Sequence, residues 1–148
     1  MALYADAARA VTVTMEIVAA LIEGIFSAAF GLTFGTWTPT STPAGAMTYT
    51  STTISGKYLQ IGKWVICKIV FTGTVGGTPN QYISMSIPAT AVSDQICGNV
   101  QLTDNGVSPV VGQLTSSGTG AVAVWRYDRV NYTAGTVSGV AYFWYEAA

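Results

Sequence analysis

Hydrophobic and polar residues alternate in short runs over residues 46–148, and glycine, proline, asparagine or serine bounds most runs. Such period-two runs, rich in Val, Thr and aromatics, are typical of β strands. The Asn105-Gly106 pair also predicts a tight turn, because both residues accept positive φ. Strands are predicted at 46–54, 57–61, 64–75, 81–87, 96–103, 109–115, 121–127 and 137–145. This spacing predicts an antiparallel β sandwich or jelly roll.

Two of these runs are apolar on both faces. In 64–71, Val65 and Cys67 alternate with Trp64 and Ile66, so neither face is polar. The run 137–145 has the same property. A strand that is apolar on both faces is covered on both sides. We therefore expect one face of these strands to meet the domain core and the other to meet a neighbouring subunit.

The first 31 residues follow a different pattern. They are rich in alanine and contain no proline, which favours a helix. Arg9, Glu16 and Glu23 are seven residues apart, so they would share one heptad position of a coiled coil. The opposite seam then has Tyr4, Val11, Val18 and Ile25 at the a positions and Ala7, Thr14, Leu21 and Ala28 at the d positions. From this seam we predict four docking or oligomerisation residues, Val11, Val18, Leu21 and Ile25.

The predicted helix is apolar beyond this seam as well, at Met15, Ile17, Ile22 and Phe26. A trimer, or a groove on a partner, would bury more of that circumference than a two-stranded coil. A membrane span and a secretory signal are the alternatives, but Glu16 and Glu23 interrupt the apolar run and disfavour both. Residues 32–45 contain Pro39 and Pro43 and predict a linker. The expected organisation is a helix over 1–31, a linker over 32–45 and a β domain over 46–148.

Composition narrows the functional classes. Only 9% of residues are charged, the formal net charge is -1, and histidine is absent. The chain therefore lacks the basic surface that nucleic acids require, as well as the commonest general base and zinc ligand. Half of the residues are hydrophobic, which excludes disorder. These properties favour a binding or structural protein over an enzyme, with no cofactor and no metal.

Serine, cysteine and acidic residues serve as catalytic groups in many enzymes, but in this sequence they lack the neighbouring residues that such roles require. No histidine is present to activate a serine or cysteine. The acids of the β domain, Asp94, Asp104, Asp128 and Glu146, are dispersed at predicted turns or chain ends, and we expect them to be solvated. Cys67 and Cys97 both fall in predicted strands, and we expect free thiols rather than a disulfide.

Aromatic residues concentrate near the C-terminus. Trp125, Tyr127, Tyr142 and Trp144 are the candidates for contact with a sugar or with another subunit. Trp and Tyr stack on sugar rings and also dominate interface hot spots. The competing interpretation is that these aromatic side chains fill the core and a subunit interface.

Four motifs occur in order along the chain: GTWTP from Gly35, MTYT from Met47, GKYLQIGKWV from Gly56 and SIPA from Ser86. Together they resemble a β domain common at the C-termini of bacteriophage tail-fibre and related virion proteins. In that family a GxWTP entry precedes a GxYxxIGxxV hairpin, and a later strand ends in a Leu-Pro or Ile-Pro corner. The resemblance covers residues 35–145. It implies a trimeric, protease-resistant β sandwich without enzymatic activity, and it carries over no fixed set of binding residues.

Three functional hypotheses follow. The first is a non-enzymatic virion structural protein, a homotrimer that contacts other virion proteins through residues 1–31 and projects its β domain from a capsid surface or a tail. The second is an attachment module that binds a host surface glycan through the aromatic residues. The third, a membrane-anchored β domain, is the least favoured because of the acidic residues in the apolar run.

Overall fold

The computed structural model describes residues 18, 21, 24, 25, 28, 31–93 and 95–148, and of residues 107–110 it describes the backbone alone. Within the predicted helix over 1–31, Val18, Leu21, Gly24, Ile25 and Ala28 have helical backbone, whereas Gly31 lies in a turn. The rest of that prediction, Val11 included, lies outside the described residues. In the described part of the chain, no helix has the length and apolarity that a membrane crossing requires.

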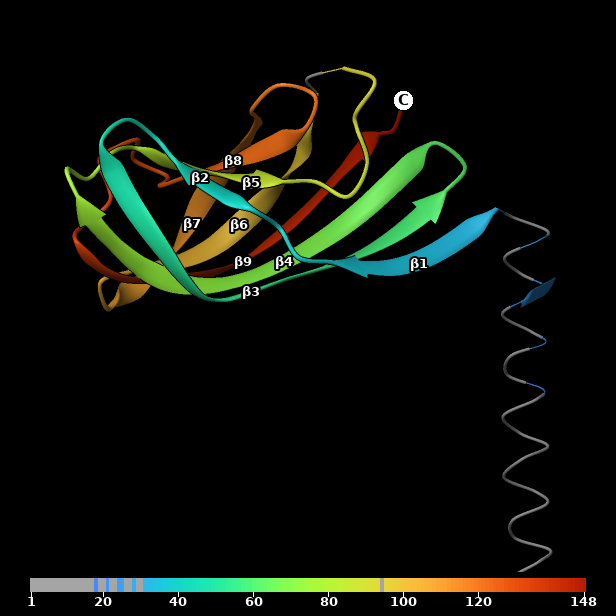
Figure 1. The fold of residues 1–148 in the computed structure, drawn as a ribbon, viewed down its shortest axis with the longest axis horizontal. Coiled ribbons are helices and arrows are strands. Elements are labelled where there is room, and N and C mark those ends of the chain that lie inside the picture. Colours follow the sequence, from blue (N-terminus) through green and yellow to red (C-terminus); the bar gives the residue numbers. More distant parts are fainter. Residues whose placement is uncertain (1–17, 19–20, 22–23, 26–27, 29–30, 94) are drawn as a thin grey trace, which may run out of the picture.

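The described residues form a mainly antiparallel β fold, as the alternation predicts (Figure 1). Nine strands pair in one sheet with the order β1-β3-β4-β9-β6-β7-β8-β5-β2. The strands are β1 Leu32–Trp37, β2 Ser41–Pro43, β3 Met47–Ile61, β4 Trp64–Gly77, β5 Tyr82–Ser86, β6 Cys97–Asp104, β7 Val107–Ser116, β8 Ala121–Trp125 and β9 Gly135–Glu146.

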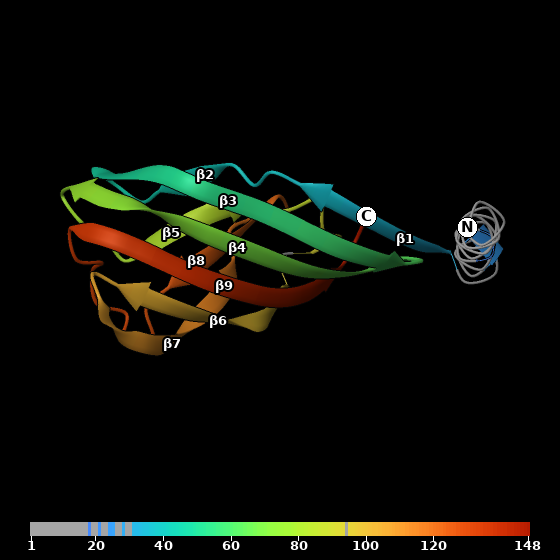
Figure 2. The ribbon, with the colours of Figure 1, turned by 90° about the horizontal axis from the view of Figure 1, so that it is seen from below.

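The sheet curls into a half-barrel. Figure 1 shows β3, β4 and β9 on one side of the core and β2, β5 and β8 on the other, and Figure 2 shows the outer side of β3, β4, β9 and β6 as consecutive neighbours. The predicted sandwich is therefore wrong in one respect: both layers belong to a single hydrogen-bonded sheet. The physical reason is that β6 and β7 continue the pairing from β9 to β8, so the sheet has no break between its layers.

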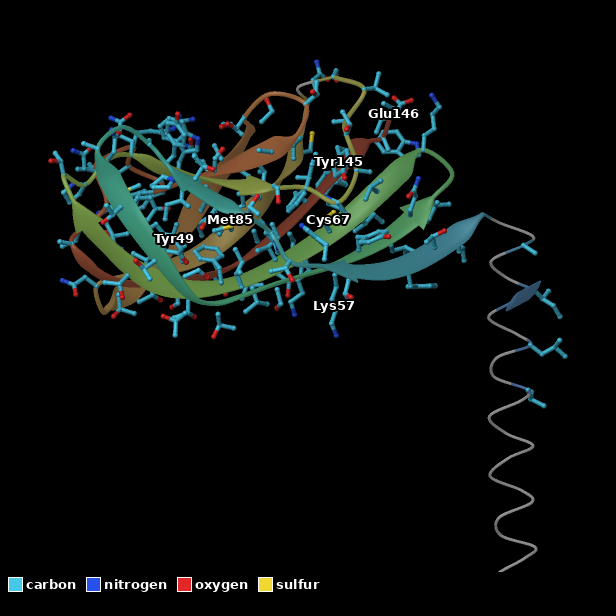
Figure 3. The ribbon with its side chains drawn as sticks, viewed as in Figure 1. Tyr49, Lys57, Cys67, Met85, Tyr145 and Glu146 are labelled. Carbon is cyan, nitrogen blue, oxygen red and sulfur yellow. The ribbon has the colours of Figure 1, made fainter. Side chains whose placement is uncertain are left out.

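The core lies on the concave inner face. In β4, Val65, Cys67, Ile69 and Phe71 are buried, and Phe143 of β9 is buried beside them. Figure 3 shows Met85, Cys67 and Tyr145 between the layers, whereas Lys57 points away from the sheet. β4 lies in the interior of the sheet, because it pairs with β3 on one side and β9 on the other.

The segment expected to be a linker contributes two strands. β1 pairs with the second half of β3, and β2 pairs with β5. Pro43 is tolerated because β2 is an edge strand, where a missing backbone donor breaks no ladder. The two strands predicted at 46–54 and 57–61 are one strand, β3, which has a register shift between Ser51 and Thr53.

Three of the four sequence motifs meet at Trp37. Its indole Nε1 donates a hydrogen bond to the carbonyl oxygen of Ser86 at 3.1 Å. The Trp37 ring contacts Tyr58 edge-on, with a centroid separation of 6.0 Å, and covers Gly56, where a Cβ would clash with the ring. Tyr58 covers Gly35 in the same way. Each glycine thus makes room for the aromatic ring of the paired strand, which explains why glycine and aromatic residues recur together in these motifs.

Candidate functional site

The outer face of the sheet carries an exposed apolar row that crosses five strands. Residues directly opposite each other on neighbouring strands share a face. The strand register aligns Phe34, Leu59, Ile66, Trp144 and Cys97 in this way. Phe34 is 71% exposed, and Ile66 and Trp144 are each about half exposed. An apolar row this long on a convex surface indicates a surface that another molecule covers.

A second row extends this surface toward the β3–β4 hairpin. It aligns Leu32, Ile61, Trp64 and Glu146. Trp64 is 56% exposed and Ile61 is 40% exposed. We call the exposed hydrophobic members of both rows the outer apolar patch: Phe34, Ile61, Trp64, Ile66 and Trp144.

Polar residues border the outer apolar patch. The next row along the strands aligns Lys57, Lys68, Tyr142 and Asn99. The Lys68 ammonium lies 5.5 Å from the centre of the Tyr142 ring, a cation–π contact. An apolar centre with a polar rim is the usual anatomy of a protein–protein interface.

The four aromatic residues expected from the sequence do not form one cluster. Tyr142 and Trp144 lie on the outer face of β9, and Trp144 belongs to the outer apolar patch. Trp125 ends β8, and β6 and β7 separate it from Tyr142 in the sheet. Tyr127 follows β8 and is exposed. The predicted glycan or interface residues are therefore divided between two regions, because sequence proximity does not reveal that β9 pairs with β4 and β6 rather than with β8.

Trp125 is held in place by three neighbours. Its ring centroid lies 4.5 Å from that of Tyr82 on β5. The Arg129 guanidinium lies 4.2 Å from the centre of the Trp125 ring, and the indole Nε1 donates to Thr115 Oγ1 at 2.7 Å. Arg129 also donates to Gln113 Oε1 at 2.7 Å. Trp125 is thus a rigid support for Tyr82.

A buried carboxylate fixes the segment after β8. Asp104 is 2% exposed and accepts hydrogen bonds from Arg126 Nη1 at 2.7 Å and from the Thr133 backbone N–H at 3.0 Å. Arg126 Nη2 also donates to Asp128 at 2.9 Å. The hydrogen bond to Asp128, followed by the charges of both acids, raises the pKa of Arg126, although burial opposes this. The expectation that Asp104 is solvated is wrong, because Arg126 neutralises it inside the fold.

The cysteines do not pair. Cys67 is buried on the inner face and Cys97 is exposed, and both thiols are free. Burial raises the pKa of Cys67 to about 12, so this thiol remains protonated and unreactive at neutral pH. Among the described residues, no group of three or more potential ligands is placed to bind a metal ion.

Comparison with known proteins gives one informative fold likeness. No family model matches the chain, and no curated protein matches it. Among solved structures, the chain is similar to the crystal structure of the Dettilon tailspike protein, gp208, with a TM-score of 0.56 and 16% sequence identity. The match covers 79% of this chain and 24% of the tailspike chain. At this identity the likeness concerns the fold: a curled antiparallel β domain of the kind found within a tailspike.

Proposed function

We propose that this chain is a non-enzymatic β domain of a bacteriophage tail, which assembles as a homotrimer through residues 1–31 and the outer apolar patch. The observation that carries the proposal is the exposure of Phe34, Trp64, Ile66 and Trp144 on one continuous face. The likeness to part of a tailspike and the order of the GxWTP and GxYxxIGxxV motifs support the tail assignment.

The occupant of the outer apolar patch is a further copy of the same chain. β1 begins at Leu32, which lies in the second row, directly after the apolar N-terminal segment. Self-association of residues 1–31 would therefore bring three copies of this face together near the same point. Within that segment Val18, Leu21 and Ile25 are exposed in the single chain, as seam residues of an unassembled helix would be.

The edge strand β1 supports the same arrangement. Among the described residues it pairs with β3 on one side and has no strand on the other, and Phe34 in it is largely exposed. An uncovered apolar edge strand invites pairing with other chains. A neighbouring subunit would cover both the strand edge and the patch. Three subunits would bury more of the circumference of the predicted N-terminal helix than two, which is why we propose a trimer.

The mass of the full chain in solution tests the assembly. Light scattering coupled to size exclusion is expected to give three subunits for the wild type. Ile66→Glu places a charge at the centre of the patch and is expected to shift the population toward monomer while circular dichroism stays unchanged. Thr74→Glu is the matched control, because Thr74 is exposed on the same face of β4 outside the patch. A monodisperse wild-type monomer, or equal effects of the two variants, would contradict the assembly.

Immunoelectron microscopy tests the location separately. An antibody against residues 46–148 is expected to label the tails of the particles that carry this chain. Labelling confined to the capsid shell would contradict the tail assignment and leave the trimer intact.

A further inference from the structure

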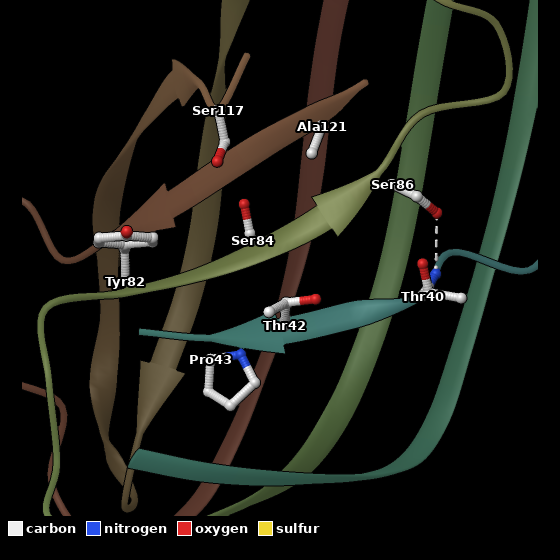
Figure 4. A pocket seen from close by; sticks show the side chains of 8 residues that line it. All are labelled: Thr40, Thr42, Pro43, Tyr82, Ser84, Ser86, Ser117 and Ala121. Atoms are coloured by element: carbon white, nitrogen blue, oxygen red, sulfur yellow. Dashed lines mark hydrogen bonds between the residues drawn. The ribbon is translucent and has the colours of Figure 1, made fainter. Parts of the chain in front are cut away.

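A groove opens on the outer face of the opposite layer, between β2, β5 and the residues that flank the β7–β8 turn. Its volume is about 290 Å³. Figure 4 shows its lining: Thr40, Thr42, Pro43, Tyr82, Ser84, Ser86, Ser117 and Ala121. It is distant in the sheet from the outer apolar patch, because β5 and β2 end the strand order that β1 begins.

The lining is hydroxylated and uncharged. Six of the eight lining residues carry a hydroxyl group, and none of the eight carries a charge. A hydroxyl both donates and accepts hydrogen bonds, so this lining complements a ligand that is itself covered with hydroxyls. It offers no counter-charge to an acidic or basic ligand. The chemistry favours a neutral polyol over a peptide, a phosphate or an acidic sugar.

Ser84 gives the groove an unfilled hydrogen-bonding position. Its side chain is on the outer face of β5, between Thr42 of β2 and Ala123 of β8 in the register. The residue is only 9% exposed, and its Oγ has no hydrogen-bond partner in the part of the chain that the structure describes. By contrast, Ser86 two residues away accepts a hydrogen bond from the Thr40 backbone N–H at 2.9 Å. Native structures leave few buried hydroxyls unpartnered, so Ser84 is a position that a ligand would satisfy.

Tyr82 supplies a fixed aromatic surface at one end of the groove. Its ring is tilted 39° to that of Trp125. Trp125 is itself held by its hydrogen bond to Thr115 and by the Arg129 guanidinium over its ring. A rigid aromatic ring beside hydroxyl groups presents both an apolar face and polar partners to one ligand. The apolar face of a pyranose ring fits against such a surface while its hydroxyls reach the serines and threonines.

We propose that this groove binds a neutral hexose unit of a surface oligosaccharide, with Ser84 hydrogen-bonded to a sugar hydroxyl and Tyr82 stacked against the ring. The groove accommodates one or two sugar units, since its volume lies just below the usual range for drug-sized ligands. This site is independent of the assembly proposed above. Trp125, one of the aromatic residues expected from the sequence, contributes to it by supporting Tyr82.

Saturation-transfer NMR on the full chain tests the site. The probes are maltotriose, cellotriose and mannotriose, with 3′-sialyllactose as the acidic comparison. At least one neutral trisaccharide is expected to show saturation transfer, with weaker transfer to the sialylated sugar. Failure of all three neutral probes, or preference for the acidic one, would overturn the proposal.

Variants locate the binding. Ser84→Ala removes the unpartnered hydroxyl and is expected to weaken affinity about 3- to 10-fold, the worth of one hydrogen bond, without lowering the melting temperature. Ala121→Trp fills the groove and is expected to abolish binding. Ser138→Ala is the matched control, because Ser138 lines a second groove of about 240 Å³ on the outer face of β9. If Ser138→Ala weakens binding and Ser84→Ala does not, the proposed site is wrong.

Discussion

The packing of Trp37 against two glycine-containing strands makes a quantitative prediction. Trp37→Ala removes the ring from Gly56 and Tyr58 and removes the hydrogen bond to the Ser86 carbonyl. Truncation of a fully buried Trp to Ala lowers the free energy of unfolding by about 3–5 kcal/mol. Trp37 is only partly buried, so we expect a loss of about 3 kcal/mol in the free energy of unfolding. Of this, about 1 kcal/mol comes from the hydrogen bond, so Trp37→Phe is expected to recover most of the stability.

Gly56→Ala perturbs the same contact from the other strand. A Cβ at Gly56 would clash with the Trp37 ring, and overpacking of this kind costs about 1–3 kcal/mol. The clash disappears when the ring is absent. The double variant Trp37→Ala, Gly56→Ala is therefore expected to be more stable than the sum of the single losses by about 1 kcal/mol or more.

Urea unfolding followed by far-ultraviolet circular dichroism, at several protein concentrations, measures these differences. Trp64→Ala is the control, because Trp64 lies on the outer face and is 56% exposed. Its effect is expected to depend on protein concentration through the assembly, whereas that of Trp37→Ala is expected to be independent of concentration. Additive losses in the double variant, or a Trp37→Ala loss no larger than that of Trp64→Ala in dilute solution, would refute the packing argument.

Two further predictions concern ionisable groups. Asp104→Ala is expected to lower the free energy of unfolding by about 2–3 kcal/mol, because it removes the carboxylate that accepts hydrogen bonds from Arg126 Nη1 and the Thr133 N–H. Asp128→Ala is expected to cost less, because solvent screens its ion pair with Arg126, and equal losses in urea unfolding would contradict the central role of Asp104. Burial raises the pKa of Cys67, Tyr49 and Tyr145 to about 12 from ordinary values of 9.0 for Cys and 10.0 for Tyr. As the pH rises, the unfolded chain therefore releases these protons before the folded chain does. The free energy of unfolding, measured with urea, is expected to hold below pH 9 and to fall between pH 9 and 12. A free energy of unfolding that stays constant over that interval would contradict this prediction.

Alternation in the sequence predicts the long interior strands well because their inner faces are almost purely apolar. β4 and β9 are the clearest cases, and the Asn105-Gly106 turn adopts the positive φ values expected for it. β1 and β2 are not predicted from the sequence, and the reason differs between them. Pro43 makes the segment of β2 resemble a linker, and in β1 Gly35 stands where a side chain would otherwise show the alternation.

The curl of the sheet cannot be derived from alternation. A strand pattern shows which residues face the core, but not which strand lies beside it. The pair β6–β9 joins segments far apart in the chain, and together with β6–β7 and β7–β8 it decides that one sheet forms both layers. The same limit explains why Asp104 looked like a solvated turn residue: its partner Arg126 is 22 residues later and reaches it only through the fold.

The candidate sites differ in how much sequence signal they leave. Trp64, Ile66 and Trp144 belong to strands that are apolar on both faces, so the sequence already points to a covered outer surface. The groove around Ser84 leaves no such signal. Its serines and threonines come from the β1–β2 segment, β5 and the β7–β8 turn, and each is indistinguishable from an ordinary exposed strand or turn residue until the sheet brings them together.

The placement of the few charged residues links the two proposed surfaces. Arg126, Arg129, Asp104 and Asp128 are engaged with one another or with Trp125 and Gln113, so they fix the segment behind the Tyr82–Trp125 pair. Lys57 and Lys68 border the outer apolar patch without entering it. Identical subunits repel where like charges meet, and a charged groove would bind charged sugars. Because these charged residues lie at rims and supports, their placement suits both a surface that meets copies of itself and a groove that selects a neutral ligand.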